Sequence, residues 1–188
     1  MSARPTWAVF GGSFDPPHLG HVLAVAWVLA ATDAERALIV PTFEHAFDKP
    51  LAPYADRVRM VRLATADLRR VEVSELEREL GGKSYTFRSL EALRARHPEV
   101  GLRLVIGGDL VEEVKRWRRY DRILELAEVY VVGRSGYAAS SGEAAPTLPA
   151  ISSTRVRERL AVGESVTGLV PRAVARYCAE RGLYRESR

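Results

Sequence analysis

The chain has little cysteine, little lysine and no long apolar run. The first and last of these shortages argue against a disulfide-linked protein and a membrane protein. Cys178 is its only cysteine, so no disulfide can form within the chain. We expect Cys178 to fill space in a helix rather than to act as a reactive thiol. The longest apolar run, Val22 to Ala31, is too short to cross a bilayer, and Met1 to Thr6 lacks the apolar core of a signal peptide. We therefore expect a cytoplasmic protein with no membrane partner.

The charge balance is mildly basic, with a formal net charge of +4. The basic residues are 25 arginines and only 3 lysines, and they are interleaved with glutamates, as in Glu75 to Glu79. That pattern is typical of a solvated helix face, so we expect no nucleic-acid partner. The exception is the cluster Lys115 to Arg119, in which Trp117 is surrounded by basic residues.

Short strand-like runs alternate with helix-like runs along the chain. We expect strands at 7–10, 37–40, 71–73, 102–106 and 129–132, and a loop at 133–149. Helices are expected at 16–31, 54–67, 85–97, from 110, through 123–127, and near 154–160 and 172–181. The alternation predicts an α/β fold, a Rossmann-like doubly wound parallel sheet with C-terminal helices. We expect one domain over residues 1–188, of which 151–188 form a C-terminal helical portion.

Ligands of such sheets bind at the carboxyl ends of the strands, and one candidate segment is FGGSFDPPHLGH at residues 10–21. Its paired glycines let backbone amides approach an anion. Asp15 is expected to cap a helix that begins at Pro16, which places His18 and His21 one turn apart near the positive end of the helix dipole. Gly20 costs about 1 kcal/mol relative to alanine, which predicts that something large lies against the backbone there. The alternatives are a tight turn with two partly exposed histidines, or a zinc site that lacks further ligands.

Two further segments have the chemistry of a nucleotide site. In ISSTRVR, residues 151–157, Ser152 and Ser153 can cap a helix whose free amides favour an anion. Arg157 follows Thr154 by three residues and can bridge phosphate oxygens. In Gly107-Gly108-Asp109, the carboxylate can accept hydrogen bonds from ribose hydroxyls, or it can cap the next helix.

The HLGH run resembles the (H/T)xGH signature of the nucleotidyltransferase superfamily, and ISSTRVR resembles its ISSTxxR motif. The two lie about 130 residues apart, at the two ends of a βα chain. The resemblance implies adenylyl chemistry at the α-phosphate of ATP. The ATP-binding residues that it implies are Gly11, Gly12, Ser13, Phe14, His18, His21, Gly107, Asp109, Ser152, Ser153, Thr154 and Arg157.

Over nearly its whole length the chain resembles bacterial nicotinate-nucleotide adenylyltransferases, which form deamido-NAD in NAD biosynthesis. Ser84-Tyr85-Thr86 resembles the family's SYT segment, and Gly107-Gly108-Asp109 followed by Trp117 resembles its GxD and Trp pairing. The resemblance implies that the tryptophan stacks on a pyridine ring whose carboxylate is read by the threonine and nearby backbone. The mononucleotide-binding residues would then be Tyr85, Thr86, Trp117, Arg118 and Arg134. A core position remains the alternative for Trp117.

Two departures from the family pattern leave the choice between nicotinate and nicotinamide mononucleotide open. The usual PPHK loop reads PTFEHAFDK at 41–49, so that Lys49, the expected phosphate-binding lysine, has an altered spacing from His45. Arg88 stands where an aspartate is common, and it either favours an acidic substrate or is a solvated helix residue. The resemblance implies His18, His21, Lys49 and Arg157 as catalytic residues, with a Mg²⁺ bridging phosphate oxygens and no metal held by protein side chains.

Three rival functions share parts of this pattern. Phosphopantetheine adenylyltransferases have both signatures but are typically shorter and lack the SYT and GxD/Trp combination. A class I aminoacyl-tRNA synthetase fragment would need an anticodon-binding region. A silent nucleotide sensor or RNA-binding module is disfavoured, because every signature residue that catalysis needs is present. The expected partners are ATP and a pyridine mononucleotide, and the sequence leaves homo-oligomerisation open.

Overall fold

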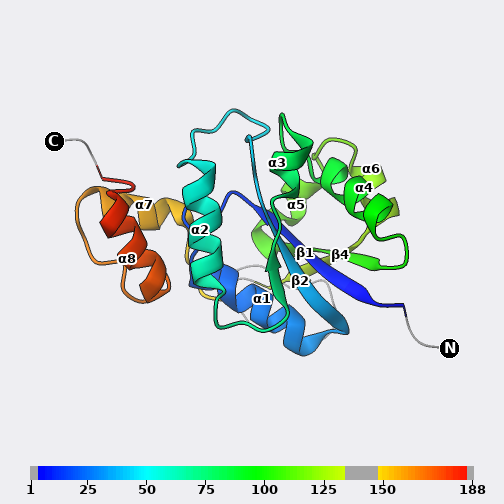
Figure 1. The fold of residues 1–188 in the computed structure, drawn as a ribbon, viewed down its shortest axis with the longest axis horizontal. Coiled ribbons are helices and arrows are strands. Elements are labelled where there is room, and N and C mark those ends of the chain that lie inside the picture. The colour runs from blue at the N-terminus through cyan, green and yellow to red at the C-terminus, as the bar shows by residue number, and fades with distance from the viewer. Residues whose placement is uncertain (1–3, 134–147, 186–188) are drawn as a thin grey trace.

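A parallel sheet of five strands forms the centre of the computed structural model, which describes residues 4–133 and 148–185 (Figure 1). The strands are β1 (Thr6–Gly12), β2 (Ala34–Pro41), β3 (Val71–Val73), β4 (Gly101–Gly107) and β5 (Glu128–Val132). Their order in space is β3-β2-β1-β4-β5, and every pairing is parallel. The chain order therefore reverses between β1 and β4, which is where sheets of this kind bind ligands.

Helices follow the strands along the chain. They are α1 (Leu19–Ala31), α2 (Tyr54–Ala64), α3 (Leu76–Leu80), α4 (Thr86–Arg96), α5 (Val111–Val114), α6 (Tyr120–Leu126), α7 (Ser153–Ala161) and α8 (Arg172–Arg181), with a 3₁₀ turn η1 at Gly108–Leu110. None of those formed by the described residues is long and apolar enough to cross a membrane.

The sheet is buried on both faces, because successive side chains of a strand point to opposite sides. On β4, Leu104 and Ile106 pack in a cluster with residues of α3, α4 and α6. Val105, between them, packs in a second cluster with residues of α1 and with Val61 of α2. The doubly wound α/β fold that the alternating sequence predicts is thus confirmed.

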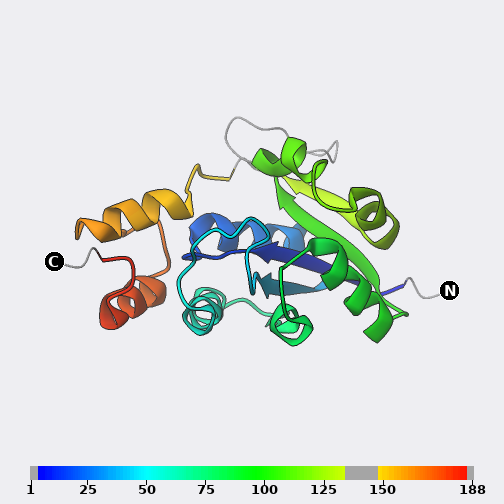
Figure 2. The same ribbon diagram turned by 90° about the horizontal axis from the view of Figure 1, so that it is seen from above.

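The C-terminal helices α7 and α8 pack against α2 rather than against the sheet. Figures 1 and 2 show α8 beside α2, and both C-terminal helices at the end of the molecule away from the N-terminus. Met60 on α2 shares a buried cluster with Val156 and Val174. Cys178 belongs to this cluster, is 1% exposed and has its Sγ 3.5 Å from the Met60 Sδ. Burial raises the pKa of the Cys178 thiol to about 11, so its predicted role as buried filler is confirmed.

Several element bounds differ from the expectations. The first helix begins at Leu19 instead of Pro16, and His18 is its N-cap residue. The second ends at Ala64, before the expected boundary at 67. The five-residue α3 was not expected as an element, and within it Glu77 is 9% exposed instead of solvated. The expected loop 133–149 lies outside the described residues except at its two ends.

Candidate active site

The two histidines of the HLGH turn stack on each other at the start of α1. Their ring centroids are 3.7 Å apart with planes inclined by 21°. The His18 backbone N–H donates a hydrogen bond to His21 Nδ1 at 3.1 Å, so the neutral His21 ring carries its hydrogen on Nε2. Both rings lie at the positive end of the α1 dipole, where an anion is favoured.

Gly20 makes this stack possible. A Cβ added to Gly20 would lie 3.0 Å from both Cε1 and Nδ1 of His18, which is closer than an ordinary contact. The prediction that something large lies against this backbone is confirmed, and the object is the His18 imidazole itself. The His18 side chain is therefore packed, with a residue exposure of 6%, whereas the alternative of a tight turn required both histidines to be partly exposed.

Phe14 supports His21 from behind. Its ring meets the His21 ring edge-on with centroids 5.0 Å apart, and the residue is 3% exposed. A Cβ at Gly12 would approach the Phe14 ring to 3.2 Å, so this glycine leaves room for the aromatic side chain. Phe14 lines neither of the cavities described below, whereas Gly11, Gly12 and Ser13 line both.

Asp15 does not cap α1, contrary to expectation. Its carboxylate Oδ1 accepts hydrogen bonds from the Tyr184 hydroxyl at 2.7 Å and from the Ala52 amide at 3.2 Å. The residue is only 3% exposed. The cap position falls to His18 because two prolines follow Asp15 and the chain becomes helical only at Leu19. Asp15 instead joins the HLGH loop to two distant segments.

The ISSTRVR segment contacts the same loop. Ser152 caps α7 by accepting a hydrogen bond from the Arg155 amide at 3.2 Å. The Ser153 hydroxyl donates to the Pro16 carbonyl at 2.9 Å. Two signatures that are far apart in sequence are therefore adjacent in space.

Arg157 also joins the two signatures. Its Nη1 donates to the Asp15 carbonyl at 2.7 Å, and its Nη2 donates to Thr154 Oγ1 at 3.3 Å. These bonds hold the guanidinium against the HLGH loop at the start of α7. They use two of its five N–H donors and leave the others for a ligand.

Two adjoining cavities open at the carboxyl ends of β1 and β4. The smaller, of about 230 Å³, lies beside the start of α1. Among the residues that line it are Gly11, Gly12, Ser13, His18, Gly20, His21, Gly107 and Asp109. Gly107 makes room for a neighbouring carboxylate, because a Cβ there would lie 2.4 Å from Asp109 Oδ1. Most of the expected ATP-binding residues thus line one cavity.

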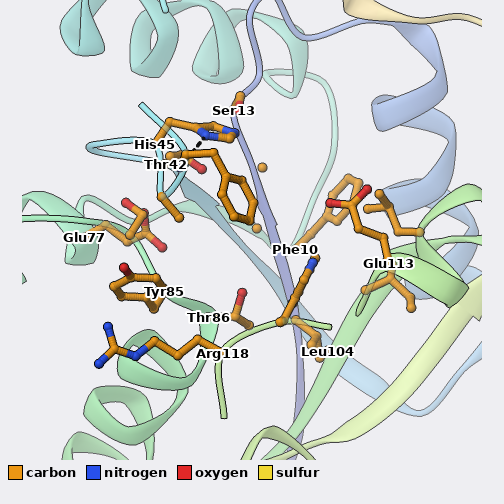
Figure 3. A pocket seen from close by; sticks show the side chains of 18 of the residues that line it. Phe10, Ser13, Thr42, His45, Glu77, Tyr85, Thr86, Leu104, Glu113 and Arg118 are labelled. Atoms are coloured by element: carbon orange, nitrogen blue, oxygen red, sulfur yellow. Dashed lines mark hydrogen bonds between the residues drawn. The ribbon is translucent and has the colours of Figure 1, made fainter. Parts of the chain in front are cut away.

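The larger cavity, of about 440 Å³, lies towards α4 and α5 and shares Phe10 to Ser13 with the smaller one (Figure 3). Tyr85, Thr86, Trp117 and Arg118 all line it. Trp117 is half-buried on the wall of this cavity. The guanidinium carbon of Arg118 lies 5.0 Å from the centre of the Tyr85 ring. Arg134, the fifth residue expected here, lies outside the described residues.

Buried charges support the larger cavity, although the sequence pattern predicts a solvated Glu77. Glu77 lines the cavity, and its carboxylate accepts hydrogen bonds from the Phe43 amide at 3.1 Å and the Ser89 hydroxyl at 3.0 Å. Burial raises the pKa of Glu77. Arg57, 1% exposed, donates to the carbonyls of Ser13 at 2.8 Å and Phe43 at 3.4 Å. Arg57 therefore joins the glycine-rich turn to the loop after β2. In the sequence, its burial could have been inferred from its place among the apolar residues of α2.

The loop after β2 carries the two residues whose spacing departs from the family pattern. His45 lines the larger cavity, and its Nδ1 accepts a hydrogen bond from the Phe47 amide at 3.2 Å. Burial and then the positive charge of Lys49 lower the pKa of His45. Lys49 itself is exposed and lines neither cavity.

Arg88 occupies a structural position. It donates hydrogen bonds to the carbonyls of Leu80, at the end of α3, and of Gly81 and Lys83, in the loop that follows. It does not line the larger cavity. Neither expectation for Arg88, a solvated side chain or a contact with an acidic substrate, describes this position.

Comparison with known proteins identifies the family. A cytidylyltransferase-like family model matches residues 9–159. The chain is 48% identical to a probable nicotinate-nucleotide adenylyltransferase of Anaeromyxobacter sp. (strain K), over 98% of this chain and 100% of that protein. The chain belongs to the nicotinate-nucleotide adenylyltransferase family. It is also 37% identical to the probable enzyme of that name from Myxococcus xanthus, over 94% and 93% of the two chains.

Solved structures show the same fold. A Plasmodium falciparum nicotinic acid mononucleotide adenylyltransferase complexed with NaAD superposes with a TM-score of 0.82 at 16% identity, over 96% of this chain and 97% of that one. A putative nicotinate-nucleotide adenylyltransferase from Vibrio parahaemolyticus superposes with a TM-score of 0.76 at 24% identity, over 97% of each chain.

Proposed function

We propose that the protein transfers the adenylyl group of ATP to nicotinate mononucleotide and releases pyrophosphate. The observation that carries this proposal is the pair of adjoining cavities at the ends of β1 and β4. The histidine turn lines one and Trp117 lines the other, and the shared Gly11, Gly12 and Ser13 lie where two phosphate groups would meet. Membership of the family supports the same assignment.

The smaller cavity suits ATP. Its phosphates would lie against the start of α1, where free amides and the helix dipole favour negative charge. Asp109 would accept hydrogen bonds from the ribose hydroxyls, beside Gly107. Arg157, fixed at the Asp15 carbonyl, would hold the β- and γ-phosphates in a fork. Lys49 would approach the same phosphates from the loop after β2.

The chemistry proposed is an in-line displacement. An oxygen of the mononucleotide 5′-phosphate attacks the α-phosphorus of ATP, and the bond from that phosphorus to the bridging oxygen breaks as pyrophosphate leaves. The attacking phosphate is already anionic near neutral pH, so no general base is needed. His21 would donate from Nε2 to the charge that develops on the α-phosphate, and the stacked His18 would hold it in place.

A magnesium ion fits this site as a companion of ATP. Within residues 4–133 and 148–185 there is no group of three or more histidine, cysteine or carboxylate side chains that could hold a metal. Mg²⁺ usually keeps several waters and binds through substrate phosphates. The ion would neutralise phosphate charge, and the protein would supply the cradle around it.

Replacing His21 tests the assignment. We expect His21→Ala to lower the rate of pyrophosphate release with nicotinate mononucleotide by about 100-fold or more, because a donor to the developing charge is lost. The thermal unfolding midpoint should change little. His97→Ala is the matched control, since His97 packs against Trp7 at the other end of β1. Wild-type turnover by His21→Ala would refute the assignment.

A further inference from the structure

The turn that follows α8 is joined to the loop before α1 by a side-chain hydrogen bond. Tyr184 follows α8, and its hydroxyl donates to Asp15 Oδ1 at 2.7 Å. Its backbone has a φ of +65°, a left-handed conformation that residues other than glycine rarely adopt. The ring is half-buried and packs against the cluster that α2, α7 and α8 form. Burial and the bond to Asp15 raise the pKa of the Tyr184 hydroxyl, so it stays a donor near neutral pH.

Asp15 is the point at which separate phosphate-binding elements are joined. Its Oδ1 also accepts from the Ala52 amide at 3.2 Å, and its Oδ2 lies 3.9 Å from Arg157 Nη1. Its backbone carbonyl accepts the 2.7 Å bond from the same guanidinium nitrogen. The next residue, Pro16, accepts the bond from Ser153. A displacement of Asp15 would therefore move the start of the histidine turn and the arginine together.

We propose that Tyr184 is a positioning residue for adenylyl transfer, which holds Asp15, and through it Arg157 and the histidine turn, in the geometry that binds the phosphates of ATP. The role rests on the proposed function, since it concerns the same site. The turn that follows α8 would therefore contribute to catalysis, although Tyr184 lines neither cavity. A buried carboxylate that loses a hydrogen-bond donor shifts towards water or another donor, and this shift is what the substitution would cause.

The chain supplies a matched control. Tyr177, on α8, donates its hydroxyl to Asp56 Oδ1 at the same distance of 2.7 Å, and Asp56 is 6% exposed. Asp56 lies on α2 and lines neither cavity. Tyr177→Phe and Tyr184→Phe thus each remove one phenol–carboxylate bond near the C-terminus, while only the second bond reaches the histidine loop.

The test compares the two variants in steady-state pyrophosphate release. We expect Tyr184→Phe to lower kcat/KM for ATP by about 10- to 100-fold, because a small misplacement of positioned groups is costly in rate. The KM for nicotinate mononucleotide should not change, since the bonds of Arg157 go to the Asp15 carbonyl and to Thr154, and not to the wall of the larger cavity. Tyr177→Phe should keep wild-type kinetics while losing a similar amount of thermal stability. Wild-type kinetics in Tyr184→Phe, or equal losses in both variants, would overturn the proposal.

Two further measurements separate this proposal from the proposed function. Calorimetric titration with ATP alone should show weaker binding to Tyr184→Phe than to Tyr177→Phe, whether or not any acceptor is adenylylated; equal affinities would overturn the positioning role. Wild-type protein that binds ATP but releases no pyrophosphate would overturn only the proposed function. If Tyr184→Phe does not fold, Asp15→Ala keeps the tyrosine ring, removes the acceptor of its hydroxyl and should show the same loss in ATP affinity, and wild-type affinity there would also overturn the proposal.

Discussion

Replacing Gly20 with alanine should lower the rate of catalysis without a comparable loss of stability. Alanine is favoured over glycine in a helix by about 1 kcal/mol, so Gly20→Ala would stabilise α1 if propensity alone decided the outcome. The added Cβ, however, would lie 3.0 Å from two atoms of the His18 ring. That ring already stacks on His21 with centroids 3.7 Å apart, so it cannot give way in that direction without disturbing the pair.

The structure therefore predicts a much larger effect on turnover than on folding. We expect the free energy of unfolding of Gly20→Ala to change by less than about 1 kcal/mol, because the gain in helix propensity offsets the strain against the His18 ring. The rate of pyrophosphate release should fall by roughly tenfold or more, since a displacement of about 1 Å can cost 100-fold. Denaturant titration measures the first quantity and a coupled pyrophosphate assay the second.

A second substitution checks the cause. In a His18→Asn background the ring that Gly20→Ala displaces is absent, so adding Gly20→Ala should cause little further loss of activity. Wild-type turnover in Gly20→Ala, or full additivity with His18→Asn, would refute the steric reasoning.

The other predictions concern the larger cavity and its supports. Trp117→Ala should raise the KM for nicotinate mononucleotide by about 10- to 100-fold, because stacking on an aromatic ring contributes ~1–3 kcal/mol; an equal rise in the KM for ATP would contradict this. Lys49→Met should raise the pKa of His45 towards 6.5, because the charge of Lys49 helps to lower it, and NMR titration of the ring measures the change. Since the folded state binds this proton less tightly than the unfolded state, the free energy of unfolding of the wild type should fall as the pH drops through 6.5, less so in Lys49→Met. Arg57→Met should lower the free energy of unfolding by about 3 kcal/mol or more, because buried carbonyls lose their donor; a denaturant titration that shows a loss below about 1 kcal/mol would contradict the role given to Arg57.

The sequence predicted the elements whose own hydrophobic pattern distinguishes a helix from a strand. The strand at 71–73 and the helix at 172–181 have the expected bounds, and the parallel, doubly wound sheet is the one that the βα alternation predicts. The start of α1 was wrong by three residues, because Pro16 suits the first turn of a helix and yet lies in the loop before it. The proximity of the two signatures was expected from the resemblance, but the bonds that join them were not.

What the sequence could not show are contacts between distant segments. Glu77 reads as one of several charges on a solvated helix, and its burial depends on how α3 packs beneath the loop after β2. Tyr184 has no local pattern that distinguishes it from any tyrosine near a C-terminus. Asp15 was expected to cap a helix because its neighbours in sequence suit that role, whereas its partners come from residues 52 and 184.

Pyrophosphate release from ATP with three acceptors in parallel tests the central claim most directly. The acceptors are nicotinate mononucleotide, nicotinamide mononucleotide and phosphopantetheine. The account predicts release with nicotinate mononucleotide at the highest kcat/KM, together with formation of the corresponding dinucleotide. Release with phosphopantetheine alone, or with none of the three, would contradict it.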